Sequence, residues 1–285
     1  MTDYRGLLPI AAEAVSRAAK AMRQQSPGTL TVKGDRDVAS QLDYAIERDV
    51  QTFLAAETPE IGFLGEEQGA TGPSEMRWVL DPIDGTANFV RGLPMCAVSL
   101  ALAHRNEAVL GIIELPFLGL LYRAAKGGGA YANGREIRAS STSHLNDAIV
   151  AIGDYAVGPD AEARNRLRLA LTAQLAAEVN RVRMTGSAAL DLAWLAEGRL
   201  DAALTLSNNA WDMAAGVVIA REAGAAVIDQ NGAAHDLDST VTLAVAPLLV
   251  EAVLGGYRKS VAKATEVRIL YPPPGARTAP DQHEC

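Results

Sequence analysis

The order of its apolar segments is the feature that most restricts how this chain can fold. In the first half, apolar runs at about 95–104, 108–115 and 119–124 follow one another across short gaps, and an Asn133-Gly134 pair comes next. Short gaps and an Asn-Gly turn are typical of antiparallel hairpins, in which consecutive strands pair. The first half is therefore predicted to contain an antiparallel sheet, and before it a helix at residues 4–24, a short strand at 29–33 and a second helix from about residue 40.

The second half of the chain follows a different pattern. From about residue 148, short apolar runs alternate with helical stretches, and this alternation is typical of α/β units. We therefore predict an α+β lobe over residues 1–145 and an α/β lobe over residues 146–265. Residues 271–285 are polar and rich in proline, and a disordered tail is predicted over residues 266–285.

Composition narrows the classes of function. The chain has 285 residues, 49% of them hydrophobic, and a formal net charge of −8. This acidic balance argues against nucleic acid or a membrane surface as a partner, because both are anionic. Neither a membrane-spanning run of about 18 apolar residues nor the apolar core of a signal peptide is found. With only Cys96 and Cys285 present, no disulfide framework is expected, and the predicted location is cytoplasmic.

The densest chemistry lies at residues 81–86, which have the sequence Asp-Pro-Ile-Asp-Gly-Thr and follow an apolar strand. The strand delivers Asp81 and Asp84 into one tight turn, where two carboxylates repel each other unless cations lie between them. Hard cations such as Mg²⁺ prefer oxygen ligands of this kind. A helix that opens at Gly85 and Thr86 would also direct free N–H groups outward, and such groups bind phosphate.

Two further acidic positions fit the same kind of site. Glu66 and Glu67 follow a short apolar strand directly, and Asp212 stands at a predicted helix start. Either alone would be read as a surface carboxylate or as a partner of a helix dipole. A calcium-binding loop is a poor fit, because the twelfth position counted from Asp81 is Gly92 rather than glutamate.

Other charged residues are interpreted as structural. The four histidines lie outside these acidic motifs, which argues against a phosphohistidine intermediate and against a histidine-rich zinc site. Arg164, Arg166 and Arg168 fall on one predicted helix and are predicted to form part of its solvated surface.

Taken together, the Gly-Glu-Glu motif ending at Glu67, the segment 81–89 and the Trp-Asp pair ending at Asp212 resemble the signatures of the inositol monophosphatase family. The resemblance covers roughly residues 5–260 in order and spacing. It implies a layered α/β/α/β/α sandwich, usually a homodimer. It also implies a lithium-sensitive, Mg²⁺-dependent phosphomonoesterase with about two or three magnesium ions in each active site.

The resemblance assigns metal ligands position by position. Glu66 resembles the carboxylate that binds the first metal and orients the attacking water, and the Ile83 carbonyl resembles a second ligand of that metal. Asp81 resembles the ligand that bridges two metals. Asp84 and Asp212 resemble ligands of the second metal.

The remaining catalytic positions follow from the same resemblance. Gly85 and Thr86 resemble the phosphate-binding N–H groups, and the Thr86 hydroxyl also resembles the group that holds the nucleophilic water. Asp43 resembles the carboxylate beside the water network. Lys33 is a looser match to a lysine near the third metal.

The substrate is predicted to be a small polyol phosphate, with inositol monophosphate first and with Asp84, Ala188, Thr205 and Asp212 contacting it. At position 205 the inositol-specific pattern carries glutamate, and a neutral hydroxyl is a weaker acceptor, so strict inositol selectivity stays open. The alternatives within the family are a histidinol-phosphate phosphatase, a fructose-1,6-bisphosphatase and a bisphosphate nucleotidase. The non-enzymatic alternative is an RNA-associated regulatory protein.

Overall fold

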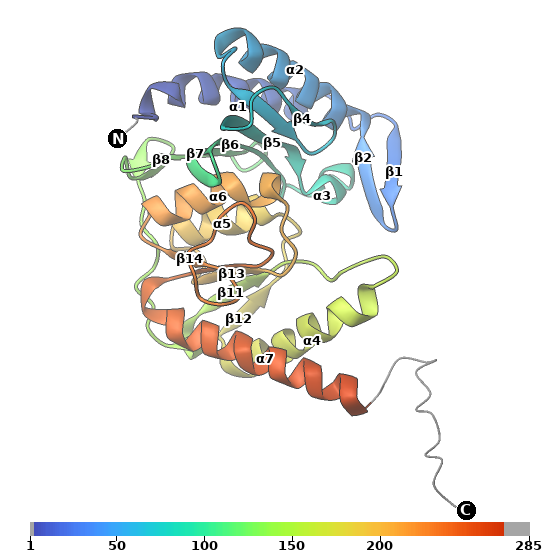
Figure 1. The fold of residues 1–285 in the computed structure, drawn as a ribbon, viewed down its shortest axis with the longest axis vertical. Helices are drawn as coiled ribbons and strands as arrows, with labels where there is room; N and C mark the ends of the chain where they lie inside the picture. Colours follow the sequence, from blue (N-terminus) through green and yellow to red (C-terminus); the bar gives the residue numbers. More distant parts are fainter. Residues whose placement is uncertain (1–2, 271–285) are drawn as a thin grey trace, which may run out of the picture.

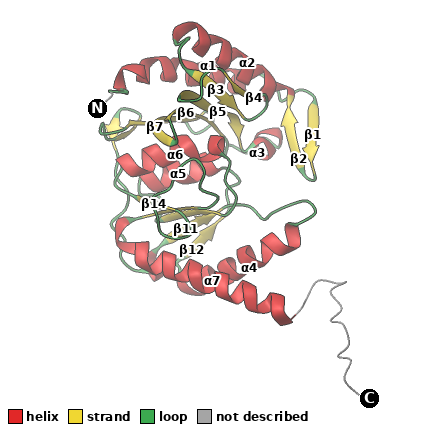
Figure 2. Cartoon of the chain, in the orientation of Figure 1, coloured by secondary structure: helices red, strands yellow, loops and turns green. Residues whose placement is uncertain are grey.

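The computed structural model describes residues 3–270, which form five stacked layers of helices and sheets (Figures 1 and 2). Two helices cover the outer face of a first sheet, two lie between this sheet and a second, and two cover the outer face of the second sheet. From first to last layer these helices are α1 (Leu8–Gln24), α2 (Gln41–Glu57), α5 (Ala188–Ala196), α6 (Ala210–Glu222), α4 (Ala161–Glu178) and α7 (Val250–Leu270). The predicted α/β/α/β/α sandwich is confirmed.

The first sheet has eight strands, and all neighbouring pairs except β3 and β5 are antiparallel. In spatial order they are β10 (Arg135–Glu136), β9 (Ala130–Ala132), β8 (Leu120–Ala125), β7 (Glu107–Leu115), β6 (Ala97–His104), β5 (Met76–Asp84), β3 (Gly62–Gly65) and β4 (Gly69–Thr71). The predicted hairpins correspond to β6, β7 and β8. Because β3 and β5 are parallel, their carboxyl ends lie at one edge, and Glu66 N–H donates to the Leu80 carbonyl across 3.2 Å.

The second sheet has five strands, three of which run parallel. In spatial order they are β12 (Arg181–Arg183), β11 (Ile149–Ile152), β13 (Ala202–Thr205), β15 (Thr242–Val245) and β14 (Ala226–Ile228). The carboxyl ends of β11, β12 and β13 therefore meet at one edge, and the loops that follow these three strands lie together.

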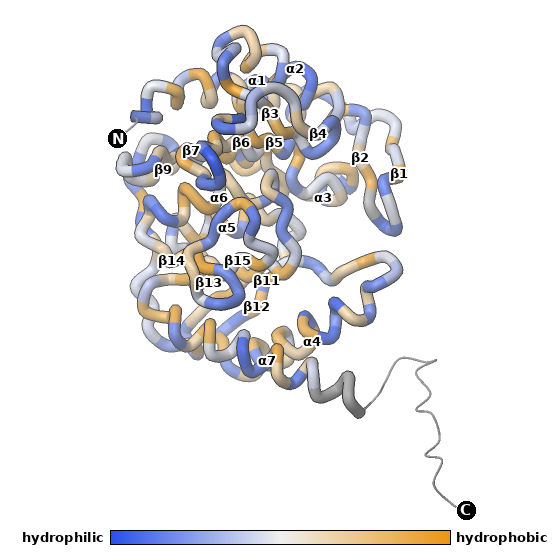
Figure 3. The backbone as a smooth tube through the Cα atoms, in the orientation of Figure 1, coloured by the Kyte–Doolittle hydropathy of each residue, from blue (hydrophilic) through white to orange (hydrophobic). Residues whose placement is uncertain are grey.

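The middle layer joins the two sheets into one apolar core. Helix α6 buries every residue from Met213 to Ala220, because it is covered by strands on one side and by α5 and the second sheet on the other. The outer helices α4 and α7 alternate between polar and apolar residues along the tube in Figure 3. The proposed division at residue 145 thus separates parts of the sequence that share a core.

The close approach of α6 to β7 depends on Gly111. A Cβ at this position would overlap the backbone of Ala215, and backbone cannot move aside as a flexible side chain can. Gly111→Ala is therefore expected to lower the free energy of unfolding by about 1–3 kcal/mol in urea denaturation. Gly255→Ala in α7 is the matched control, because nothing lies within 4 Å of its Cβ, and it is expected to stabilise by about 0.5–1 kcal/mol. Equal effects of both substitutions would contradict this account.

Two elements differ from the sequence-based expectations. Only one strand, at about 29–33, is expected near the N-terminal hairpin, whereas β1 (Leu30–Gly34) pairs with a second strand, β2 (Asp37–Ser40). Helix α7 runs through Leu270, so it includes the first five residues of the predicted tail, and residues 271–285 lie outside the described part of the chain. Over residues 3–270 no helix is long and apolar enough to cross a membrane.

Candidate active site

Strand β5 carries the acidic turn into the interior. Its residues from Trp78 onward are buried, with Asp81 only 2% and Asp84 only 7% exposed. The chain then turns at Gly85, whose φ of +84° favours glycine, and enters the short helix α3 (Thr86–Val90). A Cβ at Gly85 would also lie 3.0 Å from the Met95 carbonyl oxygen. Glycine is thus required here by both conformation and space.

Carboxylates from four segments gather around Asp81. Burial raises the pKa of Asp81 well above its ordinary value, and the charges of Glu66, Asp84, Asp212 and Asp43 raise it further. Each of these charges acts on Asp81 because all lie near the carboxyl ends of β3 and β5 or at the starts of α2 and α6. The sequence-predicted acidic residues therefore lie within electrostatic range of Asp81.

Asp84 is bound to the start of α5, more than 100 residues away in sequence. Its carboxylate accepts hydrogen bonds from the Ser187 hydroxyl, from Ala189 N–H at 2.8 Å and from Ala188 N–H at 3.3 Å. Burial raises the pKa of Asp84 to about 6 although these hydrogen bonds act to lower it. Ala188, a predicted substrate contact, thus lies directly beside Asp84.

Asp212 is the third residue of α6 and is partly exposed. Its carboxylate accepts a hydrogen bond from the Asn209 amide at 3.0 Å. Burial raises its pKa to about 7, and the charges of Asp84 and Glu66 contribute. Thr205 ends β13 seven residues earlier, and it also is partly exposed.

Thr86 lies between two predicted active-site groups. Its hydroxyl is 3.0 Å from the Ile83 carbonyl oxygen and 3.1 Å from Asp43 Oδ1, and it can donate its proton to one of them at a time. Asp43 also accepts hydrogen bonds from the backbone and hydroxyl of Ser40, which caps α2. Burial raises the pKa of Asp43 to about 6.

Lys33 on β1 reaches the acidic group from the side of the hairpin. Its Nζ lies 2.7 Å from Glu66 Oε1 and 2.9 Å from Glu67 Oε1. Burial lowers the pKa of Lys33, but the hydrogen bonds to both glutamates outweigh burial and raise it. Among residues 3–270, no group of three or more histidine, cysteine or acidic side chains is arranged closely enough to hold a metal ion as it stands.

Sequence reasoning missed Glu47. This fully buried side chain of α2 accepts hydrogen bonds from Glu67 N–H at 2.9 Å and Gln68 N–H at 2.7 Å, which fixes the turn that carries Glu66. A Cβ at Gly65 would overlap the Glu47 carboxylate, so glycine leaves room for it. A signal was present, because Glu47 follows Asp43 by four residues and so shares its helix face.

The prediction of a solvated surface is wrong for Arg168, which is only 8% exposed. Instead of water, its guanidinium donates hydrogen bonds to the backbone carbonyls of Asp154, Arg164 and Leu206 and to the Ser207 hydroxyl. The long arginine side chain can therefore be buried on a helix that otherwise carries charge outward.

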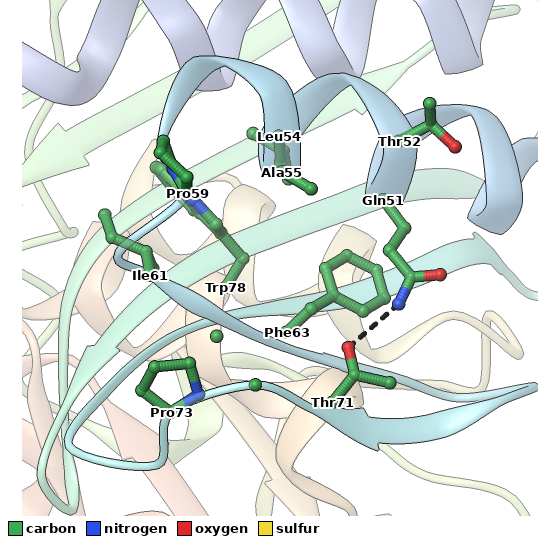
Figure 4. A pocket seen from close by; sticks show the side chains of 12 residues that line it. Gln51, Thr52, Leu54, Ala55, Pro59, Ile61, Phe63, Thr71, Pro73 and Trp78 are labelled. Carbon is green, nitrogen blue, oxygen red and sulfur yellow. Dashed lines mark hydrogen bonds between the residues drawn. The ribbon is translucent and has the colours of Figure 1, made fainter.

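A cavity of about 430 Å³ lies apart from the acidic residues, between α2 and strands β3 and β4 (Figure 4). Phe63, Trp78 and Pro73 line it, and Gln51 donates a hydrogen bond to Thr71 at its rim. None of its lining residues is titratable. It therefore has no side chain that could act as a general acid or base at neutral pH.

Comparison with known proteins agrees with this geometry. The model of the inositol monophosphatase family matches residues 3–265. An inositol-1-monophosphatase of Mesorhizobium japonicum is 38% identical over 81% of this chain and 86% of its own length. A Nus factor SuhB of Xylella fastidiosa is 38% identical over 70% and 72%.

The fold comparison gives the same family. The crystal structure of the extragenic suppressor protein suhB from Bartonella henselae superposes with a TM-score of 0.83 at 32% identity, over 89% of this chain and 99% of that one. Family match, sequence identity and fold therefore agree across nearly all of residues 3–265. The chain belongs to the inositol monophosphatase family, and it is accordingly a phosphatase, a hydrolase of phosphate esters.

Proposed function

We propose that this chain is a Mg²⁺-dependent phosphomonoesterase that acts on a small polyol phosphate, with inositol monophosphate as the first candidate. The observation that carries the proposal is the concentration of negative charge around Asp81, whose pKa is raised by burial and by four neighbouring carboxylates. Buried like charges of this number favour a divalent cation, and an all-oxygen donor set fits Mg²⁺.

The ligand set in this proposal comes from the family resemblance. Glu66, Asp81 and the Ile83 carbonyl would hold one metal, and Asp81, Asp84 and Asp212 a second. When bound, such a pair of metals lowers the pKa of a water and stabilises the departing alkoxide. The contact of Lys33 with Glu66 implies that this lysine withdraws from Glu66 or shares it when the ligand set is complete.

The other residues would orient the reactants. The Thr86 hydroxyl, shared between Asp43 and the Ile83 carbonyl, would hold the nucleophilic water in line with the phosphorus. Asp43 would accept a proton from the pair formed by the Thr86 hydroxyl and this water. Its raised pKa of about 6 suits proton transfer near neutral pH. The N–H groups of Gly85 and Thr86 would bind phosphate oxygens. Asp84, Ala188, Thr205 and Asp212 would contact the alcohol portion.

The test is phosphate release by the purified chain from a panel of esters. The panel contains inositol 1-phosphate, histidinol phosphate, fructose 1,6-bisphosphate and a 3′,5′-bisphosphate nucleotide, each with Mg²⁺ or with EDTA. The expected result is Mg²⁺-dependent release with the highest kcat/KM for inositol 1-phosphate, and inhibition by lithium. Failure to hydrolyse any ester with Mg²⁺ would refute the proposal. A higher kcat/KM for another ester would make that ester, rather than inositol 1-phosphate, the proposed substrate.

Two further features are proposed, the first from the family resemblance and the second from the low cysteine content. We propose that the chain is a homodimer and that it works in the cytoplasm. Sedimentation equilibrium of the purified protein tests the first, since a monomer at micromolar concentration would contradict it. Fractionation of cells that produce the protein tests the second.

The second candidate function is association with RNA in a regulatory role. The observation that favours it is the similarity to a protein named a Nus factor in Xylella fastidiosa, whereas the net charge of −8 opposes it. Salt-sensitive binding of RNA by a protein inactive on every ester would support this candidate. An active phosphatase that does not bind RNA would exclude it.

A further inference from the structure

The loops after three parallel strands form one wall beside the acidic group. Strands β11, β12 and β13 are parallel neighbours, so their carboxyl ends lie at the same edge of the second sheet. The loop after β12 brings Ser187 to Asp84, and the loop after β13 leads to Asp212. The loop after β11, which begins with Gly153 and Asp154, therefore borders the same site, as ligand sites in open α/β sheets commonly do.

Arg168 ties two of these loops together. From α4 its Nε donates to the Asp154 carbonyl at 3.2 Å, and its Nη2 donates to the Leu206 carbonyl at 3.2 Å and to the Ser207 hydroxyl at 2.7 Å. One planar guanidinium thus fixes the backbone after β11 relative to the backbone after β13. No other residue of the described chain donates side-chain hydrogen bonds to both loops.

The burial of Arg168 is unfavourable by itself. No carboxylate pairs with its guanidinium in residues 3–270, and burial together with the charge of Arg164 lowers its pKa. Burying a cation without an anionic partner is costly, and an apolar side chain would fill the space more cheaply. What arginine adds here is the fixed geometry of the two loops.

The Asp154 carboxylate is available for a ligand. It is exposed, and it accepts no hydrogen bond and forms no ion pair within the described chain. A Cβ at Gly153 would lie 3.6 Å from Thr205 Cγ2, so the residue that directly precedes Asp154 lies against Thr205. Its charge also reaches Asp191, whose pKa is raised to about 8 by burial first and then by the charges of Asp84 and Asp154. Asp154 therefore lies within electrostatic range of Asp191, which the charge of Asp84 also reaches.

We infer that Asp154 accepts hydrogen bonds from the hydroxyl groups of the substrate, and that Arg168 is the positioning residue that holds Asp154 and the Thr205–Ser207 loop in place for this contact. This rests on the proposed phosphatase function and extends it to the alcohol portion of the substrate. Position 205, where the inositol-specific pattern carries glutamate, is threonine here. The missing carboxylate is supplied from the end of the adjoining strand.

The chemistry favours a polyol over a cationic alcohol. The Arg168 guanidinium lies against the Asp154 backbone, so its positive charge would repel an ammonium or imidazolium group brought to this loop. Neutral hydroxyls still gain a charge-assisted hydrogen bond from the carboxylate. The substrate class is therefore a polyol phosphate such as inositol 1-phosphate rather than an amino-alcohol phosphate such as histidinol phosphate.

Asp154→Ala tests the acceptor. For inositol 1-phosphate, loss of a hydrogen bond to a charged group is expected to raise KM about tenfold or more with little change in kcat. For p-nitrophenyl phosphate, which has no hydroxyl group to recognise, KM is expected to stay within about twofold. Asp160→Ala is the matched control. It removes another exposed carboxylate from the same loop, one whose side chain makes no capping hydrogen bond to α4, and it should change KM for neither substrate.

Arg168→Met and Arg168→Lys test the positioning role. Both are expected to reproduce the selective rise in KM for inositol 1-phosphate, because lysine keeps the charge but not the planar set of donors. Arg166→Met, on the same helix and paired only with Glu162, is the control. A variant with lowered Tm and equal losses on both esters would show that Arg168 acts on stability alone, and this would overturn its assignment.

Rescue separates the remaining outcomes. Adding Thr205→Glu to Asp154→Ala is expected to lower KM for inositol 1-phosphate most of the way back to the wild-type value, because a carboxylate returns on the neighbouring strand. If wild-type protein releases inositol phosphate and Asp154→Ala is unchanged, this inference fails while the proposed function stands. If Asp154→Ala instead raises KM more for histidinol phosphate than for inositol 1-phosphate, the polyol assignment is overturned. If wild type hydrolyses no ester, the proposed function itself fails.

Discussion

Asp81→Asn is expected to abolish Mg²⁺-dependent phosphate release while raising the thermal stability of the EDTA-treated protein. Asparagine keeps the shape of the side chain and an oxygen that can accept the 3.0 Å hydrogen bond from Ile83 N–H. It loses the charge that would join two metals, so kcat/KM should fall roughly 10³-fold or more. Without metal, the same change removes repulsion from Glu66, Asp84, Asp212 and Asp43, and Tm should rise by roughly 2–4 °C.

The opposite directions of the two effects make this experiment decisive. Phosphate release is measured with inositol 1-phosphate and Mg²⁺, and Tm is measured in EDTA by circular dichroism. Asp49→Asn, an exposed carboxylate on α2, is the control and should alter neither quantity. Retained activity would show that Asp81 is not a metal ligand, and a lowered Tm would show that mutual repulsion of the carboxylates is unimportant.

The parts of the site that could be predicted are those encoded by local sequence. The apolar run that leads into Asp81 predicts a strand, which continues through Asp84, and glycine at position 85 allows the turn that follows. The hairpins β6, β7 and β8 were predictable for the same reason, because consecutive strands joined by short turns pair with each other. Each of these inferences uses contacts between residues close in sequence.

The parts that could not be predicted depend on contacts between distant segments. Nothing near Asp84 indicates that Ser187, 103 residues later, donates to its carboxylate. The burial of Arg168 depends likewise on two loops that meet only once β11 and β13 pair. Periodicity marks a helix face as polar, but it does not distinguish water from backbone carbonyls as the partner of a guanidinium. Glu47 was open to prediction only as a neighbour of Asp43.

The EDTA-treated protein is expected to lose thermal stability as pH rises from 6.5 to 8. Burial raises the pKa of Asp212 to about 7 and that of Asp191 to about 8, from an ordinary value of 3.8. The folded state thus binds these protons more tightly than the unfolded chain, so the stabilisation is complete at acidic pH and is lost as pH rises through the folded values. A fall in Tm of roughly 5 °C or more is expected.

This window of pH isolates the carboxylates from the buried histidine. Burial lowers the pKa of His235 from 6.5 to about 4, so the stability that depends on its neutral form is complete above pH 6.5 and is lost only as pH falls toward 4. Between pH 4 and 6.5 its effect therefore opposes that of Asp84 and Asp43, whose pKa values are each raised to about 6. Above pH 6.5, of the groups named here, only the acidic ones make Tm depend on pH.

Saturating Mg²⁺ is expected to reduce this fall in Tm. Carboxylates must lose their protons to bind a metal, so Mg²⁺ stabilises the folded state more at pH 8 than at pH 6.5. Asp191→Asn separates the effect of Asp191 from that of the proposed ligands. Because Asp191 is not one of these ligands, its replacement should remove the part of the fall in Tm that occurs toward pH 8 in EDTA and leave the stabilisation by Mg²⁺ intact. A Tm that rises with pH in EDTA, or equal stabilisation by Mg²⁺ at both pH values, would contradict a metal site built from these carboxylates.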